Sequence, residues 1–271
     1  MELELKKAIQ ESGNNLHLEV AEFLEHLGWS VDISPYYCDE FTDKPREIDI
    51  IASRKIQILT GATQEETNYW FSVVFFIECK NFTKNLNFRV FDNDKNLSKE
   101  ILCNQSLNLR LGNMFKEAEN ILENHHYLST HQIAKLYDYP KNGQDDVFQA
   151  ITQVVKSFIF FGEKMAEGVK GCVCYPLVVY SGINGVYLMP NNNTGDNYLD
   201  SLIKQKSALF NLKYSYPKTD FISSRTSYPT KDFYVDLIHK DELENFLMNI
   251  EKNEIEKIKL FWGDVKNRNK L

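Results

Sequence analysis

The sequence predicts an α/β protein in which helices flank a mixed β-sheet. Residues 73–77 are a run of β-branched and aromatic residues, typical of a strand buried on both faces. Residues 147–161 are apolar enough to form a central helix. Strands are also expected at 172–180, 186–189 and 233–238, from their apolar runs and the turn residues around them. These segments together indicate one sheet with helices packed against it.

An amphipathic helix is expected near the start of the chain. From residue 15 to 27, apolar residues recur at helical spacing, and Gly28 is a typical residue to end such a helix. At about 100° per residue, Glu19 falls between Leu16 and Phe23, at the edge of the apolar stripe. Glu19 is therefore the acid of this helix that we expect to face inward.

The apolar strand at 73–77 continues into Glu78-Cys79-Lys80, so it ends in an acid and a base. Side chains two residues apart on a strand point to the same side, and Glu78 and Lys80 are expected to lie together while Cys79 points away. An ion pair at the rim of a sheet would also explain these residues.

A second β-branched run, at 46–58, contains Asp49 among apolar residues, where a carboxylate is costly unless it is paired or bound to a cation. Residues 60–68 are polar and turn-forming, so we expect an antiparallel hairpin that places Asp49 across from Glu78 and Lys80. Two carboxylates beside a lysine suit Mg²⁺, which would activate water and stabilise the charge of a phosphodiester under attack.

Asp49, followed after a hairpin-length gap by Glu78-Cys79-Lys80, resembles the motif of the PD-(D/E)XK nuclease superfamily, which has the restriction-endonuclease-like fold. The resemblance implies an enzyme that uses Mg²⁺ or Mn²⁺ to hydrolyse phosphodiester bonds, with DNA as the first expectation and RNA as an alternative. It implies an endonuclease in restriction, repair or phage defence. Asp49, Glu78 and the backbone carbonyl of Cys79 would hold the metal, and Lys80 would assist the attacking water.

Two further features resemble the same family. Its members carry an acid on the first helix, before a Gly-aromatic pair that opens the first strand, as Glu19 precedes Gly28-Trp29 here. Glu19 is thereby implied as a catalytic acid and metal ligand. Several branches carry a glutamine on the helix after the acid-x-lysine strand, near the metal or the DNA backbone, and Gln153 resembles it, with Gln149 as the rival. On this resemblance Gln153 and its helix neighbour Lys156 are implied to contact nucleic acid, and a solvated helix surface would explain both residues equally.

A basic segment between residues 203 and 231 is the best candidate for a phosphate-and-base surface. Its six cations against one acid, Asp220, leave an excess of 6 − 1 = 5 positive charges, and five aromatic residues are interleaved with them. Ordinary strand and loop composition is the alternative. The cations are Lys204, Lys206, Lys213, Lys218, Arg225 and Lys231.

The expected organisation is a nuclease core in two parts, 1–96 and 145–271, interrupted by a helical insertion at 97–144 that could select substrate or form a homodimer. The net charge of −7 argues against a surface coated uniformly in basic residues. The chain start lacks a signal peptide's apolar region and no segment reaches the length of a membrane span, so a cytoplasmic protein is expected.

Other metal chemistry is not expected. Five scattered cysteines form neither a disulfide framework nor a CxxC zinc pattern. His125, His126 and His131 have no thiol or second histidine pair at ligand spacing beside them, and Ser129-Thr130 indicates a helix junction instead.

Two rival functions remain open. A nucleic-acid-binding module could keep the nuclease fold without turnover, and it would bind without cleaving under any divalent metal. A cytoplasmic interaction protein that uses the helical insertion would lose assembly when about residues 97–140 are deleted, and it would bind no nucleic acid.

Overall fold

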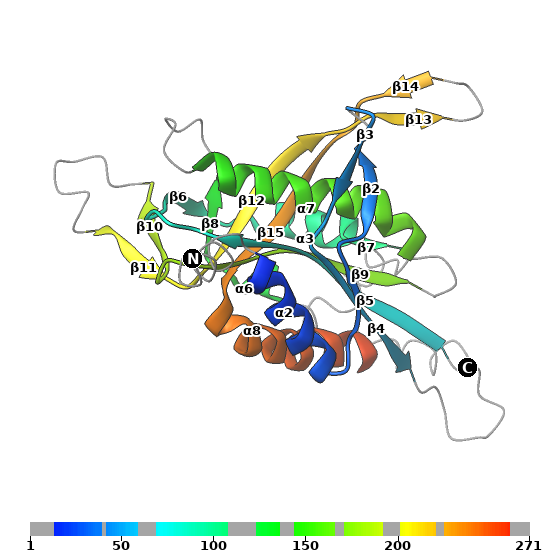
Figure 1. The fold of residues 1–271 in the computed structure, drawn as a ribbon, viewed down its shortest axis with the longest axis horizontal. Helices are drawn as coiled ribbons and strands as arrows, with labels where there is room; N and C mark the ends of the chain where they lie inside the picture. The colour runs from blue at the N-terminus through cyan, green and yellow to red at the C-terminus, as the bar shows by residue number, and fades with distance from the viewer. Residues whose placement is uncertain are drawn as a thin grey trace, which may run out of the picture.

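The computed structural model describes residues 14–39, 42–58, 69–107, 123–135, 144–165, 171–191, 201–220 and 225–260. These residues form a mixed α/β fold, with one large sheet of parallel and antiparallel strands and helices on both of its faces (Figure 1). None of the helices in these ranges is long and apolar enough to cross a membrane.

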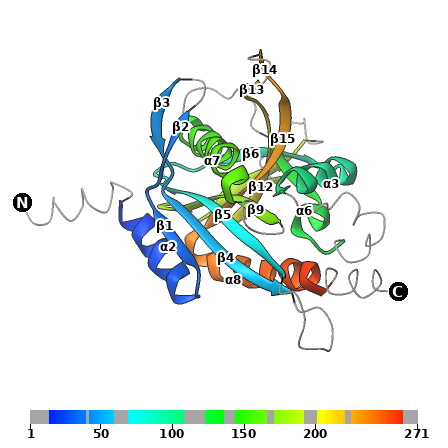
Figure 2. The same ribbon diagram turned by 90° about the vertical axis from the view of Figure 1, so that its right-hand side faces the viewer.

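The large sheet has the strand order β1-β4-β5-β9-β15-β12-β8-β6-β10-β11, and β7 pairs with β9. Two small hairpins, β2-β3 and β13-β14, stand apart from it on the side of α7 (Figure 2). The strands of the large sheet are β1 (Ser30–Ile33), β4 (Ile50–Ile58), β5 (Tyr69–Asn81), β6 (Asn87–Asp92), β7 (Ser106–Leu107), β8 (Gln132–Lys135), β9 (Cys172–Ser181), β10 (Val186–Pro190), β11 (Ile203–Gln205), β12 (Ser207–Ser215) and β15 (Thr230–His239). The hairpin strands are β2 (Tyr36–Asp39), β3 (Lys44–Glu47), β13 (Lys218–Asp220) and β14 (Arg225–Ser227).

The expected antiparallel hairpin is confirmed as β4 and β5, which pair from Ile50 opposite Ile77 to Ile58 opposite Tyr69. The polar connection between the two strands lies outside the described residues. β5 also runs parallel to β9, and β9 parallel to β15, so the apolar run at 73–77 lies in the middle of the sheet. Its five residues are fully buried because both faces of this strand are covered.

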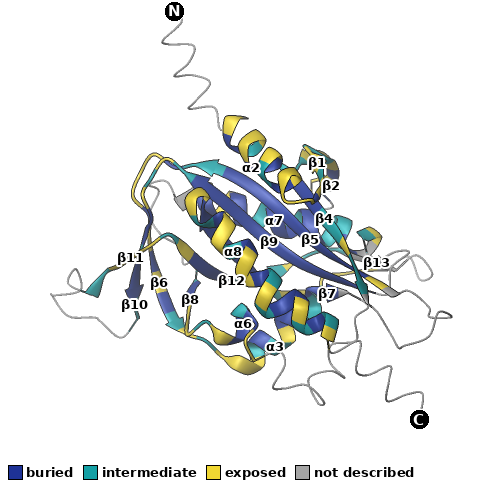
Figure 3. Ribbon diagram, turned by 90° about the horizontal axis from the view of Figure 1, so that it is seen from below, coloured by how far each residue is buried: buried dark blue, intermediate teal, exposed yellow. Residues whose placement is uncertain are grey.

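Helices divide the core into two layers. On one face of the sheet, α7 (Gln144–Met165) packs on Val74 and Phe76 of β5. On the other face lie α2 (Asn14–His26) and α8 (Leu243–Ile250), whose outer sides are exposed while the strands behind them are buried (Figure 3). The alternation of β5 therefore directs its even-numbered side chains, Glu78 and Lys80 included, towards the face that α7 covers.

The segment 97–144 is not purely helical, contrary to the expected insertion. It contains most of α3 (Lys95–Asn104) and the short helix α6 (His126–Ser129), but also two strands of the large sheet. β8 lies between β12 and β6 in that sheet, and β7 adds to β9. Where the structure describes it, the segment is therefore part of the sheet.

Candidate functional site

Asp49, Glu78 and Lys80 come together where β5 emerges from the sheet. Asp49 directly precedes β4, and the β4–β5 register places it opposite Glu78. The backbone N–H of Cys79 donates to Oδ2 of Asp49 (2.7 Å), and Nζ of Lys80 donates to Oε1 of Glu78 (2.7 Å). Glu78 is 2% exposed, whereas about a third of the Lys80 side chain is open to solvent. Buried Glu78 and half-buried Asp49 are thus reached from solvent beside the lysine.

The position of this site in the sheet favours ligand binding. β5, β9 and β15 run parallel, and Lys80, Tyr180 and His239 are register partners at their carboxyl ends. In open α/β sheets, ligands bind at the edge where the carboxyl ends of the strands meet. Glu78 and Lys80 lie at that edge.

Burial and mutual repulsion set the charge of the site. Burial raises the pKa of Glu78, and the nearby charge of Asp49 raises it further, to about 7 in spite of Lys80. Burial also raises the pKa of Asp49. The hydrogen bond from Cys79 and the charges of Lys80 and His17 lower this pKa, but burial outweighs them. Burial lowers the pKa of Lys80, but the charge and hydrogen bond of Glu78 outweigh it, so the net pKa is raised. The lysine therefore stays charged, while Glu78 exchanges its proton near neutral pH.

These residues fit a divalent cation. Oε2 of Glu78 is buried and has no hydrogen-bond partner, although Oε1 is bonded to Lys80. A buried carboxylate oxygen without a partner is costly, and a cation held between Glu78 and Asp49 would satisfy it and relieve their repulsion. An oxygen-donor set with an adjacent solvent opening suits Mg²⁺ or Mn²⁺.

The titration of Glu78 gives a stability prediction for the metal-free protein. Its folded pKa of about 7 lies above its ordinary value of 4.5, so folding stability falls as pH rises between these values. In Glu78→Gln this loss is absent. Chemical denaturation in the presence of a chelator should show the variant gaining about 2 kcal/mol on wild type between pH 5 and pH 8. A Glu25→Gln control, at an exposed position on α2, should show no such gain, and equal curves for Glu78→Gln and wild type would contradict the assignment.

Glu19 does not face the site, contrary to expectation. Its side chain is 59% exposed and forms an ion pair with Lys240 (3.0 Å). The helix residue that acts on Asp49 is instead His17, two positions earlier, whose charge lowers the pKa of Asp49. Leu16 and Val20 do pack in the core, so the apolar stripe is correct. The inward edge of that stripe is the one that carries His17.

Gln153 and Lys156 lie close to the site without touching Asp49. Nε2 of Gln153 donates to the backbone oxygen of Glu47, and Nζ of Lys156 donates to Oδ2 of Asp39 (2.8 Å). Both residues thus tie α7 to the β2–β3 hairpin. Their expected contact with nucleic acid is not tested by this geometry.

Asp39 and Tyr37 also belong to this region, although no pattern in the sequence indicates it. Asp39 is 2% exposed and contacts Lys156 and Arg46 (3.8 Å to Nε). Burial, Asp39 and Glu78 together raise the pKa of Tyr37, whose hydroxyl donates to the backbone oxygen of Gln153. Asp39 stands in a polar, turn-forming stretch of the sequence that favours a solvated acid, but Lys156 of α7 packs against it.

The basic side chains that the structure describes between residues 203 and 231 do not all lie on one surface. Strand alternation directs Lys213 to the sheet face opposite that of Glu78, and Phe210 is fully buried in the core. Lys204 stacks over Tyr187 on β10, at 5.8 Å from the ring centroid. Arg225 lies on β14, but its side chain is outside the described residues.

Lys206 is the cation of this group that lies beside the strand edge of the site. Its backbone oxygen accepts from the hydroxyl of Tyr180 (3.3 Å) and from the backbone N–H of His239 (2.8 Å). Its ammonium pairs with Asp241 (3.1 Å).

A second cluster of ionisable groups lies on the other face of the sheet. His126 on α6 bridges Glu254, in the π-helix η3 (Glu251–Ile255), and Asp236 on β15. Burial lowers the pKa of His126, but the two carboxylates outweigh it and raise the pKa to about 10. The charges of His125 and His126 hold the pKa of Glu254 well below its usual range in spite of burial.

Comparison of the chain with protein-family models, with curated proteins and with solved structures found no match.

Proposed function

We propose that this protein is a metal-dependent nuclease of the PD-(D/E)XK type, with a restriction-endonuclease-like fold, that hydrolyses phosphodiester bonds in DNA. The observation that carries the proposal is the pair of half-buried Asp49 and buried Glu78 beside Lys80, in which Oε2 of Glu78 has no hydrogen-bond partner among the described residues. A charge pair with purely structural value would not leave a buried carboxylate oxygen unsatisfied.

The residues divide the chemistry among them. Asp49 and Glu78 would hold Mg²⁺ or Mn²⁺, with the backbone carbonyl of Cys79 as a third donor, and the bound cation would supply Lewis acidity and neutralise charge on the phosphate. Lys80 is charged, bonded to Glu78 and partly open to solvent, so its ammonium can orient a water molecule or stabilise the negative charge that develops on a phosphate oxygen.

Groups around the site can position a substrate. Lys206 and Lys240 lie at the same strand edge. Each forms an ion pair with a surface acid, Asp241 and Glu19 respectively, and each could exchange that acid for a phosphate group of a substrate. Lys156 and Gln153 lie on α7, next to the β2–β3 hairpin. These lysine and glutamine side chains would contact the phosphate backbone of a nucleic acid and not its bases. Any sequence preference would therefore have to come from other residues of the protein.

The test is a cleavage assay with the full chain. Supercoiled plasmid, linear duplex, single-stranded DNA and RNA are each incubated with Mg²⁺, with Mn²⁺ and with a chelator. Metal-dependent DNA cleavage supports the proposal, and conversion of closed circles to nicked or linear forms identifies an endonuclease. Binding without cleavage under every metal would favour a nuclease fold that only binds nucleic acid.

Glu19→Ala should change the cleavage rate by less than about fivefold, because an exposed ion pair with Lys240 contributes little. His17→Ala, on the inward edge of the same helix, should have the larger effect of the two, and initial rates on one plasmid substrate compare them. If Glu19→Ala were as inactive as a variant of Asp49, Glu19 would be a catalytic acid after all.

A further inference from the structure

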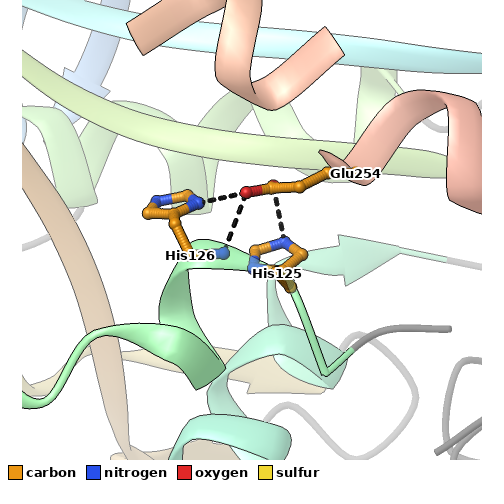
Figure 4. A group of neighbouring side chains, drawn as sticks. All are labelled: His125, His126 and Glu254. Carbon is orange, nitrogen blue, oxygen red and sulfur yellow. Dashed lines mark hydrogen bonds and ion pairs between the residues drawn. The ribbon is translucent and has the colours of Figure 1, made fainter. Parts of the chain in front are cut away.

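The buried cluster on the face opposite Asp49 and Glu78 has the donors of a transition-metal site. His125 and His126 stand at the start of α6, and Glu254 reaches them from η3 (Figure 4). Their ligand atoms, two imidazole nitrogens and a carboxylate oxygen, lie within 4.8 Å of one another. Single-turn π-helices are rare and often occur at functional sites, and this one turns Glu254 into the core.

His126 is oriented as a metal-binding histidine is. Its Nδ1 lies 2.5 Å from Oε1 of Glu254, and its Nε2 lies 3.0 Å from Oδ2 of Asp236. Histidine ligands almost always donate the hydrogen of their second nitrogen to a carboxylate, carbonyl or water. Asp236 can accept this hydrogen from Nε2 of His126. The hydroxyl of Tyr175 donates to Oε2 of Glu254 (2.8 Å) and so orients that carboxylate.

His125 completes the donor set. Its side chain is 0% exposed, and its Nε2 lies 2.9 Å from Oε2 of Glu254. Nδ1 of His125 accepts from the backbone N–H of Tyr127, so Nε2 is the nitrogen that faces the carboxylate. A cation between the two groups would take both as ligands.

The cluster also holds two buried carboxylates. Asp236 and Glu254 are buried and both contact His126. No lysine or arginine is among the described residues that line the adjoining cavity. A divalent cation would be a suitable partner for these two carboxylates.

The cluster is also accessible. His126, Asp236 and Glu254 line a cavity of about 570 Å³ beneath α8, which Phe246, Asn249 and Asn253 also border. A metal and a small ligand can therefore reach the cluster without unfolding of the chain.

We propose that His125, His126 and Glu254 bind a divalent transition metal of the Zn²⁺ class, with Asp236 as the residue that orients His126. Two imidazoles and one carboxylate form a donor set of catalytic zinc sites, in which the fourth position holds water or substrate. That position would open into the cavity. The inference is independent of the proposed nuclease activity, whose oxygen donors lie on the other face of the sheet.

Binding would rearrange protons and contacts in a defined way. His126 would release its Nδ1 proton, and the proton of His125 would move from Nε2 to Nδ1. This move costs the bond from the backbone N–H of Tyr127 to Nδ1 of His125, which at 3.2 Å is the longest hydrogen bond in the cluster. Ligand atoms at zinc distances of about 2.0–2.1 Å stand about 3.3 Å apart in a tetrahedral site. The 2.5 Å contact between His126 and Glu254 would therefore open by about 0.8 Å, and ligand atoms that are now up to 4.8 Å apart would approach by up to about 1.5 Å.

The test is titration of the metal-free full chain with Co²⁺, followed by displacement with Zn²⁺. The protein should carry Asp49→Asn and Glu78→Gln, so that the other carboxylate pair takes no metal. The strong visible absorption of four-coordinate cobalt should appear at one equivalent and disappear on addition of Zn²⁺. Absence of these bands in this folded protein, with no heat of Zn²⁺ binding, would leave only a proton-held ion-pair network and overturn the proposal.

Variants then assign the ligands. His126→Ala and Glu254→Gln should abolish the cobalt spectrum, and Asp236→Asn should weaken Zn²⁺ binding by about 10- to 100-fold. His131→Ala is the matched control, because His131 is exposed in the same cavity but outside the cluster. An unchanged spectrum in His126→Ala would also overturn the assignment. If a ligand variant fails to fold, the Co²⁺ titration of the protein with Asp49→Asn and Glu78→Gln alone still tests whether the cluster binds metal.

Discussion

Asp49→Asn and Glu78→Gln should each lower the rate of Mg²⁺-dependent DNA cleavage by about a thousandfold or more, while the protein stays folded. A bound cation supplies several kcal/mol of charge stabilisation to the transition state, and each 1.36 kcal/mol is a factor of ten in rate. The two carboxylates lie next to each other, so loss of either would remove half of the cation's anionic ligands. Each amide keeps the shape of the side chain and removes its charge.

Two measurements accompany the rates. Titration with Mn²⁺ should show that each variant has lost metal affinity, and thermal unfolding without metal should show a protein at least as stable as wild type, because the repulsion between Asp49 and Glu78 is gone. Asp32→Asn is the matched control, since this exposed acid lies on β1, next to β4. Full activity in Asp49→Asn would rule out this pair as the metal site.

The part of the site that the sequence predicts is the part that depends on local structure. Glu78 and Lys80 share a side because a strand alternates, and Asp49 lies opposite because the two strands pair in one hairpin register. The apolar runs on both strands fixed that register. Neither step needs the position of any distant element.

What the sequence did not predict depends on packing between distant elements. Spacing on a helix defines the apolar stripe of α2, but the docking angle on the sheet decides that His17 and not Glu19 approaches Asp49. Asp39 is buried, and its partner Lys156 comes from α7, 117 positions later in the chain. The basic surface expected at residues 203–231 was inferred from the net charge of the segment. A net charge does not show that alternate side chains of β12 point to opposite faces of the sheet.

The histidine cluster was the part of the structure least predictable from the sequence. His126 and Glu254 are 128 positions apart, and Asp236 comes from a third element. Ligand spacing along the chain could not reveal the cluster, since only two of its members are near one another in sequence. The irregular turn of η3, which points Glu254 inward, has no signature in the pattern of apolar residues.

Lys80→Gln and Lys80→Ala should lose DNA cleavage by several orders of magnitude and still bind Mn²⁺ and DNA within a small factor of wild type. Lys80 donates to Glu78 at 2.7 Å, and its raised pKa keeps it charged, so it repels a cation and cannot be a metal ligand. Its contribution would come from stabilising charge that exists only in the transition state, and removal of such an interaction lowers turnover without lowering affinity.

The measurement is single-turnover cleavage at saturating metal, beside Mn²⁺ titration and DNA binding in Ca²⁺. Lys84→Ala, an exposed lysine four residues further along, is the control for a simple loss of positive charge, and it should cleave at close to the wild-type rate. Because Glu78 loses its ion pair with Lys80 in Lys80→Ala, metal-free Glu78 should hold its proton to a still higher pH, and the metal titration should be run above pH 8. If Lys80→Ala cleaved normally, or if metal binding at that pH disappeared together with activity, then the strand end at Glu78 and Lys80 would not be the catalytic element.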